Sequence, residues 1–233
     1  METVVENGTF KNKMVGLFKE HEQVILRNDT RHVSALRYQS IEKFDELDIP
    51  SRKTEDWKHT DVSKALNKDY YQYLNRDEKE IDIEKVFTCN VHNFETDQIS
   101  LLNGWHIQTD ESLTRFDNGV IAGSLASAMR EHPELVDKHF GRYADVSKNL
   151  FHALNTALAS DGVFIYVPDN VVIDKPIQMI SIINHDKNLM LHTRNLIVMG
   201  KNSKLTLVQC DDSTNQQASF NNSISEVYLD QNS

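Results

Sequence analysis

The stretch FIYVPDN at residues 164–170 has the composition of a short strand that runs into a polar corner. The same outline returns in LIVMGKN at 196–202 and in VYLDQN at 227–232. Each stretch ends in asparagine, and these asparagines stand at positions 170, 202 and 232. A period of about 30 residues with several short strands per period is typical of a solenoid of stacked coils.

Asparagine suits the corner of such a coil, because its backbone tolerates the left-handed conformation and its amide can bond to the next coil. An antiparallel meander is the alternative, since hairpin turns also favour asparagine. Stacked coils are the better interpretation, because hairpins normally carry more glycine than the two, Gly162 and Gly200, found after residue 160. The last period stops at its corner, so we expect its open strand edges to be covered by another chain, a further segment or a neighbouring molecule.

The N-terminal part has helical patterning instead. Apolar residues follow one helical face over residues 9–27 and again over 33–47, before Pro50. Between them Asp29 or Thr30 can cap the second helix. The pattern predicts two antiparallel helices joined by a short turn.

The middle of the chain mixes both patterns. Strands are expected near 86–91 and 99–107, the latter around an Asn-Gly turn, and helices over 122–130, up to Gly141 and over 147–159. We therefore predict an α+β fold in three parts. These are a helical region (1–80), a mixed connection (81–160) and an incomplete β-helix (161–233).

Composition excludes several classes of partner. The formal net charge of −10 argues against nucleic acid and anionic membrane surfaces as ligands. The sequence has no apolar run long enough to span a bilayer, and METVVENGTFKNK at its start lacks the layout of a signal peptide. Two cysteines provide no disulfide framework. Together these features predict a soluble cytoplasmic protein.

Five segments in the same order resemble the SufB/SufD family of iron–sulfur cluster assembly proteins. PSRKTEDWKHTD resembles the family's N-terminal Pro-x-x-Lys-x-Glu-x-Trp-Lys-Tyr-Thr-Asp signature, with His59 in place of tyrosine. The others are ISLLNGWHIQTDESL, LNTALASDGVFIYVPDNVVIDKPIQMIS, HTRNLIVMGKNSKLTLVQ and NNSISEVYLDQNS. The resemblance covers the chain from about Leu36, and the compact helical start is closer to SufD than to SufB.

This resemblance implies a helical region followed by a right-handed parallel β-helix. It also implies a scaffold subunit that is not an enzyme, pairs with a SufB-like chain and an ABC-type ATPase, and belongs to a complex that assembles nascent clusters. The SufD-like chain is associated with iron acquisition in that complex. The family's β-helix continues past Ser233, and the absent part carries the ATPase contact and the reactive Cys and His positions. The resemblance therefore transfers no catalytic, cofactor-binding or metal-binding residue to this chain.

Motifs read from the residues alone give no complete catalytic site. Gly200-Lys201 fails as a phosphate loop, because Asn195 and Asn202 stand where that loop needs Gly and Ser/Thr. A solenoid corner is the better interpretation. G-x-S-x-G and H-E-x-x-H are also absent.

Four further groups are candidate sites, and each has a structural interpretation that we prefer. Asp56, His59 and Asp61 flank Trp57 and are candidates for an acid–base site. We prefer a structural interpretation, in which Trp57 is a packing anchor and Thr60 or Asp61 caps the helix that follows. His21 is expected to pack on the apolar face of the first helix. The metal candidates are Cys210, Asp211, Asp212 and His192, without C-x-x-C or H-x-x-x-H spacing. Cys89 is expected to be a small buried residue.

Two other functions remain open at this point. A β-helix carbohydrate lyase or hydrolase would use carboxylates such as Asp169, Asp174 and Glu226, provided that the coils align them. A self-assembling module would pair its open coil with a second copy, as a homodimer or a larger assembly.

Overall fold

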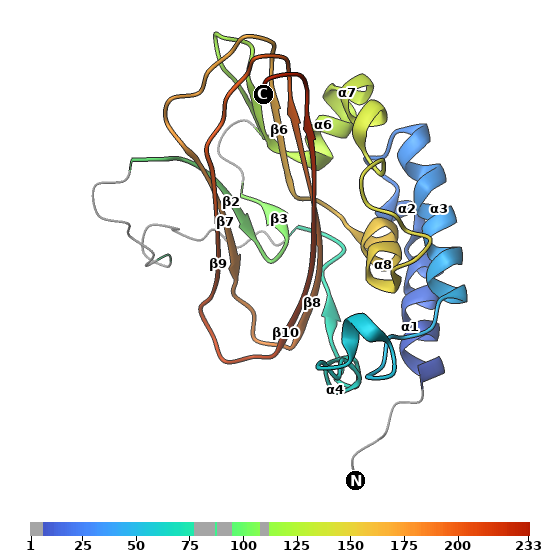
Figure 1. The fold of residues 1–233 in the computed structure, drawn as a ribbon. Helices are drawn as coiled ribbons and strands as arrows, with labels where there is room; N and C mark the ends of the chain where they lie inside the picture. Colours follow the sequence, from blue (N-terminus) through green and yellow to red (C-terminus); the bar gives the residue numbers. More distant parts are fainter. Residues whose placement is uncertain (1–6, 77–86, 88–94, 108–111) are drawn as a thin grey trace.

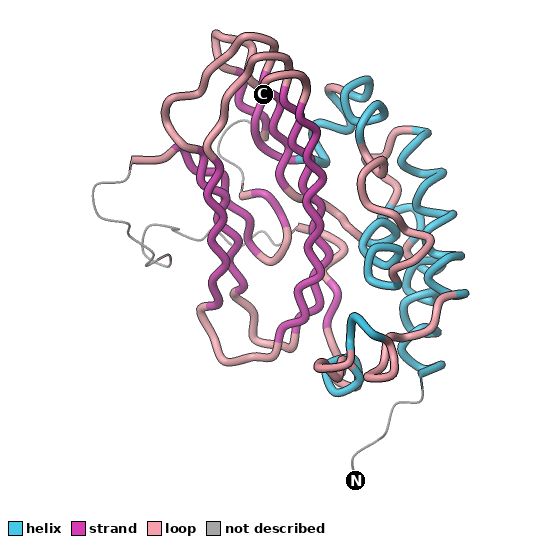
Figure 2. The backbone as a smooth tube through the Cα atoms, viewed as in Figure 1, coloured by secondary structure: helices cyan, strands magenta, loops and turns pink. Residues whose placement is uncertain are grey.

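The structure is a computed structural model, and it describes residues 7–76, 87, 95–107 and 112–233. Helices lie along one side of a pair of curled sheets, so the fold is mixed α and β (Figures 1 and 2). The helices are α1 (Asn7–Glu20), α2 (Glu22–Ile25), α3 (Arg31–Glu46), the 3-10 helix η1 (Glu55–Trp57), α4 (Ser63–Leu66), α6 (Leu125–Glu131), α7 (Pro133–His139) and α8 (Leu150–Leu158).

The strands form two sheets. One sheet has the order β1-β8-β6-β5-β4, with β10 also paired to β8, and the other has the order β3-β2-β7-β9. The strands are β1 (Tyr71–Gln72), β2 (Asp97–Leu102), β3 (Trp105–His106), β4 (Leu113–Arg115), β5 (Ile121–Ser124), β6 (Val163–Val167), β7 (Ile177–Ile183), β8 (Leu189–Met199), β9 (Leu207–Ser213) and β10 (Ser219–Leu229).

From β6 onward the chain alternates between the two sheets, and each strand pairs in parallel with the strand one period later. Phe164 pairs with Leu196, and Leu196 pairs in turn with Glu226. In the other sheet β7 pairs with β9 at the same period, with Ile177 opposite Leu207. These parallel pairs exclude the antiparallel meander for this part of the chain.

The corner asparagines repeat as the sequence predicts. Asn170, Asn202 and Asn232 have φ angles of 62°, 53° and 60°, which place all three in the left-handed region. The Asn202 Nδ2 donates to Asn170 Oδ1 at 3.0 Å, and the Asn232 Nδ2 donates to Asn202 Oδ1 at 3.1 Å. The side chains form a hydrogen-bonded ladder from one corner to the next.

Apolar side chains fill the space between the sheets and the space between sheet and helices. The space between the sheets is lined by residues such as Ile165, Ile197 and Met179. On the opposite face of β8, Met190 packs with α1, α3 and α8 in a second cluster. Because both faces of β8 are covered, all eleven of its residues are buried.

The N-terminal helices form as predicted, with one break. The predicted helix over 9–27 is interrupted at His21, which separates α1 from α2. The Thr30 Oγ1 accepts a hydrogen bond from Val33 N at 3.1 Å and so caps α3. The helix before Pro50 ends at Glu46.

Several predicted boundaries are wrong. Residues 122–124 belong to β5, which runs antiparallel beside β6, so α6 begins only at Leu125. The last predicted helix begins at Leu150, where Asn149 Oδ1 accepts from Phe151 N and His152 N. The sequence also predicts two separate short strands, LML at 189–191 and LIVM at 196–199, but both are parts of the single strand β8. The Asn103-Gly104 turn does join β2 to β3, whereas the strand expected near 86–91 lies outside the described residues.

None of the helices in the described part of the chain is long and apolar enough to cross a bilayer.

Candidate functional site

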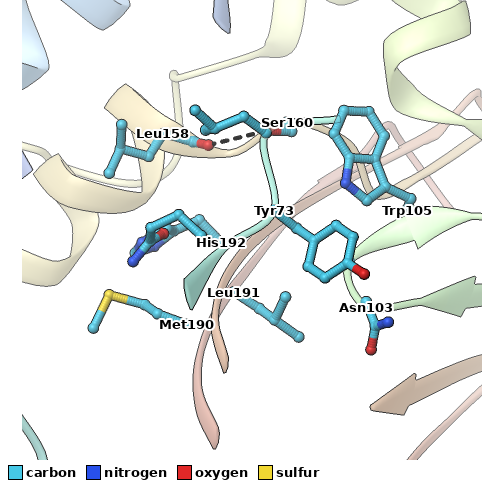
Figure 3. A pocket seen from close by; sticks show the side chains of 11 residues that line it. Tyr73, Asn103, Trp105, Leu158, Ser160, Met190, Leu191 and His192 are labelled. Atoms are coloured by element: carbon cyan, nitrogen blue, oxygen red, sulfur yellow. Dashed lines mark hydrogen bonds between the residues drawn. The ribbon is translucent and has the colours of Figure 1, made fainter. Parts of the chain in front are cut away.

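A small pocket lies where β1, the β2–β3 turn, the end of α8 and β8 meet (Figure 3). Asn103 comes from the turn and Trp105 from the start of β3. Tyr73 follows β1, and His192 and Met190 come from β8. The space that the centre of a water molecule can occupy in this cavity is about 10 Å³, so the cavity holds roughly one water. It is too small for an organic substrate.

His192 is the buried titratable side chain among the described residues that line this pocket. Its Nδ1 lies 3.3 Å from the Nδ2 of Asn222, which donates to it, so the ring proton is on Nε2. That Nε2 is buried and has no hydrogen-bond partner among the described residues. Burial lowers the pKa of His192 to about 3. The ring is therefore neutral at pH 7, and it cannot serve there as an effective general base.

Beside this pocket, α8 and the neighbouring strands enclose a buried ion pair. The Arg194 Nη2 lies 2.6 Å from the Glu226 Oε1, and each side chain is 1% exposed. Arg194 Nη1 also donates to Asn155 Oδ1 and Thr156 Oγ1, both at 3.2 Å. The charges are thus fully bonded, as burial requires.

Glu226 extends this network to the loop after α7. Its Oε1 accepts from Gly141 N at 2.8 Å and its Oε2 accepts from Tyr143 N at 2.9 Å. The Arg194 guanidinium lies 5.1 Å from the Phe140 ring centroid, over the ring. One carboxylate therefore joins β10, β8 and the α7–α8 loop.

A second buried carboxylate organises the start of the stacked strands. Asp161 Oδ1 accepts from Ser124 Oγ at 2.9 Å and from Ala126 N at 3.0 Å, and its Oδ2 accepts from His106 N at 3.1 Å. Close by, Asn195 Oδ1 accepts from Val163 N at 2.9 Å. These bonds hold the β2–β3 turn, α6 and β6 in one arrangement.

The residues around Trp57 do not form an acid–base site. Asp56 and His59 are exposed, and Trp57 packs with its ring centroid 5.4 Å from that of Phe151. Asp61 Oδ1 accepts from Ser63 N at 3.1 Å at the start of α4. The predicted packing role of Trp57 is therefore confirmed. The predicted cap is wrong, because α4 begins at Ser63: its N-cap residue is Val62, and no side chain bonds there as a cap.

The structure corrects the role predicted for His21 and does not describe Cys89. His21 is exposed at the bend between α1 and α2, so its predicted packing role is wrong: the helix is interrupted at this residue. Cys89 lies outside the described residues.

The structure does not bring the metal candidates together. His192 lies on β8 of one sheet, whereas Cys210, Asp211 and Asp212 lie on β9 of the other. Cys210 accepts a hydrogen bond from Gln178 Nε2 at 3.3 Å. Across the described residues, no group of three or more His, Cys, Asp and Glu side chains is placed to hold a metal ion.

Gly200-Lys201 forms a corner of the stacked strands. Lys201 N donates to Asp169 Oδ1 at 2.7 Å, and Gly200 N donates to Val167 O at 2.8 Å. A Cβ on Gly200 would lie 2.5 Å from Asp169 Oδ1, so this corner admits only glycine without rearrangement. These backbone amides thus bond to the end of β6 and to the corner that follows it, so the segment is a corner between strands and not a phosphate loop.

The carboxylates considered for a lyase or hydrolase have different surroundings. Glu226 is 1% exposed and bound to Arg194, so a sugar chain cannot reach it. Asp169 is bonded to the next corner, and Asp174 is exposed on the connection between β6 and β7.

Sequence reasoning missed the buried network, although a signal for it exists. Arg194 lies among the polar residues 192–195 between two apolar runs of β8, and Glu226 follows it close to one period later. A charged residue inside a buried strand requires a partner, and the repeat indicates where to look for it.

The helices lie on one side of the parallel strands, and buried polar networks join the two layers. In the described residues, the buried charged side chains serve to join these elements and form no catalytic site. A family model described as the SufBD protein N-terminal region matches residues 9–179. The chain belongs to the SufBD family.

Several curated proteins are similar to the chain. The iron-sulfur cluster assembly SufBD family protein ycf24 of Trieres chinensis is 26% identical over 199 residues, which cover 78% of this chain and 40% of that protein. The SufBD family protein slr0076 of Synechocystis is 23% identical, with 80% and 42% covered. The iron-sulfur cluster assembly protein SufD of Bacillus subtilis is 35% identical over 130 residues, with 54% and 29% covered. The chain thus spans about two fifths of the length of the first two relatives.

Proposed function

We propose that this chain acts in iron–sulfur cluster assembly as a SufD-like scaffold subunit of the SUF system and is not an enzyme by itself. Its partners are a SufB-like chain and an ABC-type ATPase, and its place of action is the cytoplasm. Its substrate is iron or a nascent cluster handled by the whole complex.

The observation that carries this proposal is the family match over residues 9–179 together with the parallel pairing of β6, β8 and β10. The names of the relatives support cluster assembly, and the 35% identity to a SufD supports the SufD-like assignment. The three-part division at residues 80/81 and 160/161 remains part of the proposal.

We also propose that the strands after residue 161 are the first coils of a right-handed parallel β-helix. Support comes from the alternation between sheets, the parallel pairing of strands 32 residues (β6 and β8) or 30 residues (β7 and β9) apart, and the ladder of corner asparagines. Right-handed crossover is the strong preference for parallel strands.

Co-purification tests the partner assignment. The chain, carrying an affinity tag, is co-expressed with the SufB-like and ABC-type ATPase subunits of its own genome. We expect both to elute with it as one species in size-exclusion chromatography. Elution of the tagged chain alone would contradict the partner assignment.

A genetic test addresses the pathway. Deleting the gene that encodes the chain should lower the activity of an iron–sulfur enzyme such as aconitase, and a plasmid copy should restore it. Malate dehydrogenase, which has no cluster, serves as the control. Equal loss of both activities would point to a general growth defect instead.

The carbohydrate-active alternative is disfavoured by the buried, paired state of Glu226. A panel of acidic polysaccharides tests it directly, and cleavage of any of them by the purified chain would revive it. Sedimentation velocity over a range of concentrations tests self-association into a homodimer.

A further inference from the structure

Three asparagines of the chain are followed by glycine: Asn7, Asn103 and Asn118. In such a pair the backbone nitrogen of the glycine can attack the side-chain amide of the asparagine without an enzyme. Glycine favours this reaction because it has no side chain to hinder the approach and because its backbone bends freely. The structure gives Asn103 and Asn118 very different surroundings, so their reactivities should differ.

Asn103 is fixed in the buried turn between β2 and β3, and the residue is 2% exposed. Its Nδ2 donates to Asn184 O at 3.0 Å, and its Oδ1 accepts from Asn184 N at 2.9 Å. Both ends of the side-chain amide are therefore bonded to the protein. A reaction at this amide needs the turn to open first, and the free energy of that opening lowers its rate.

Asn118 lies at the exposed tip of the hairpin between β4 and β5. Val120 N donates to Asn118 Oδ1 at 3.3 Å, which folds the asparagine side chain over the backbone of Gly119. The amide carbon, Cγ, is thus turned toward the glycine nitrogen. Attack on Cγ develops negative charge on Oδ1, and Val120 N is the donor that stabilises this charge.

One hydrogen bond of the hairpin opposes the reaction. Gly119 N donates to Phe116 O at 2.8 Å, and this bond must open before the nitrogen can attack. The strand β4 has three residues and stands at the end of its sheet, where it pairs with β5 alone among the described strands. A short edge hairpin with an exposed backbone opens at a low cost in free energy.

We propose that Asn118 is a site of spontaneous deamidation in the folded protein. The Gly119 nitrogen gives its proton to hydroxide and forms a bond to Asn118 Cγ, while the bond from Cγ to Nδ2 breaks and ammonia leaves with a proton from water. The product is a cyclic succinimide. Water then opens the ring at one of its two carbonyls and gives aspartate or isoaspartate. Both products add a negative charge, and isoaspartate also inserts the side-chain methylene carbon into the backbone.

The modified turn would lie against the first corner of the stacked strands. A Cβ on Gly119 would lie 3.2 Å from Pro168 Cγ, so the turn and the corner are in close contact. Asn118 and Val172, which follows that corner, also line the same cavity. We therefore expect the lengthened backbone of isoaspartate to loosen the β4–β5 hairpin from the stacked strands. This inference does not depend on the proposed role in cluster assembly.

Incubation of the purified chain at mildly alkaline pH tests the proposal, with Asn103 as the matched control in the same molecule. Tandem mass spectrometry of tryptic peptides follows the change from amide to carboxyl, and Asn118 is the only asparagine in peptide 116–130. In the folded protein we expect Asn118 to react about tenfold faster than Asn103 or more, because Asn103 must wait for its turn to open. In guanidinium chloride the two should react at similar rates, since both precede glycine.

Isoaspartate gives a second measurement. A protein isoaspartate methyltransferase transfers a labelled methyl group to this product, and the label should appear in peptide 116–130 of the aged wild type. Asn118→Gln should remove it from this peptide, because glutamine would have to form a larger ring. Circular dichroism checks that the variant is folded.

Two results would overturn the proposal. The first is an Asn118 that stays intact in the folded protein although it reacts in guanidinium chloride, because the bond from Gly119 to Phe116 would then protect it. The second is an equal rate at Asn118 and Asn103 in the folded protein, because unfolding of the whole chain would then control both reactions.

Discussion

Arg194 and Glu226 are buried residues of opposite charge, and each is stabilised by the bonds that it makes. Every oxygen of the Glu226 carboxylate accepts from a backbone amide or from Arg194. Removing one charge leaves the other buried without compensation, which costs far more than the net contribution of the pair.

We predict that Glu226→Gln destabilises the protein by about 3 kcal/mol or more. The side chain keeps its shape, so the loss reports the uncompensated guanidinium of Arg194. Urea unfolding followed by circular dichroism measures the free energy. The double variant Arg194→Met with Glu226→Met should recover most of the loss. If Glu226→Gln were as stable as the wild type, the conclusion that Arg194 depends on Glu226 for charge compensation would be wrong.

His192 gives the protein a pH dependence of definite sign. In the unfolded chain a histidine has a pKa of about 6.5, whereas burial lowers the pKa of His192 to about 3. Below pH 6.5 the unfolded state takes up a proton that the folded state excludes, so stability falls as the pH drops from about 6.5 toward 3. This residue alone contributes a slope of up to about 1.4 kcal/mol per pH unit.

We therefore predict that His192→Leu makes the unfolding free energy less sensitive to pH. Urea unfolding at pH 6.5, 5.5 and 4.5 compares it with the wild type, and the difference in stability should shift in favour of the variant by roughly 2 kcal/mol across that range. Met190→Leu, a change on the same face of β8, controls for packing and should keep the wild-type slope. Equal slopes in His192→Leu and the wild type would show that His192 is not buried as a neutral ring.

At the level of the element, a coil of this chain depends on its corner. We predict that Asn202→Leu costs about 1–2 kcal/mol, because leucine is strained at a φ of 53° and cannot continue the ladder. Asn202→Gly keeps the backbone conformation and loses only the amide bonds, so it should cost less. Urea unfolding separates the two contributions. A neutral Asn202→Leu would mean that the corner relaxes freely.

Two glycines provide a matched pair for a second prediction. A Cβ on Gly162, at the start of β6, would lie 1.9 Å from Arg194 O, so Gly162→Ala should destabilise by about 3 kcal/mol or more. A Cβ on Gly16 of α1 meets nothing within 4 Å, and Gly16→Ala should stabilise by about 0.5–1 kcal/mol. Thermal unfolding of both variants measures the contrast, and shifts of the same sign would contradict it.

Local sequence patterns predict the elements whose environment is also local. The helix α3 and its Thr30 cap follow from spacing and capping chemistry. Ala122 and Ser124 suit a helix, yet their pairing with β6, which comes much later in the chain, makes them part of a strand. The sequence predicts two strands in place of β8 because residues 192–195 are polar or charged, and only the distant partners of these side chains explain their burial.

For the whole molecule, burial predicts the order in which parts of the structure open. β8 is covered on both faces and bonded along both edges, whereas β9 has alternate residues exposed. In hydrogen exchange read by mass spectrometry, we predict that peptides from 189–199 exchange most slowly and those from 207–213 much faster. Equal rates would show that the stacked strands open as one unit.

The recurrence of the corner asparagines is a long-range signal contained in the sequence, which is why the parallel stacking could be predicted. The pocket beside His192 could not be predicted, because its lining comes from β1, the β2–β3 turn, α8 and β8, and no spacing in the sequence indicates that these elements meet. The same holds for the network of Asp161, since its donors lie on three separate elements. A site whose residues come from separate elements can be found only once the arrangement of those elements is known.

The bond between Glu226 and the loop after α7 has a consequence for synthesis on the ribosome. Gly141 and Tyr143 leave the exit tunnel before Glu226 does, so their amides lack the Glu226 carboxylate as a partner until β10 has emerged. The helices can pack against one another early, but their attachment to β10 through Glu226 forms only late. Nascent chains arrested before and after β10 should therefore differ sharply in their resistance to protease.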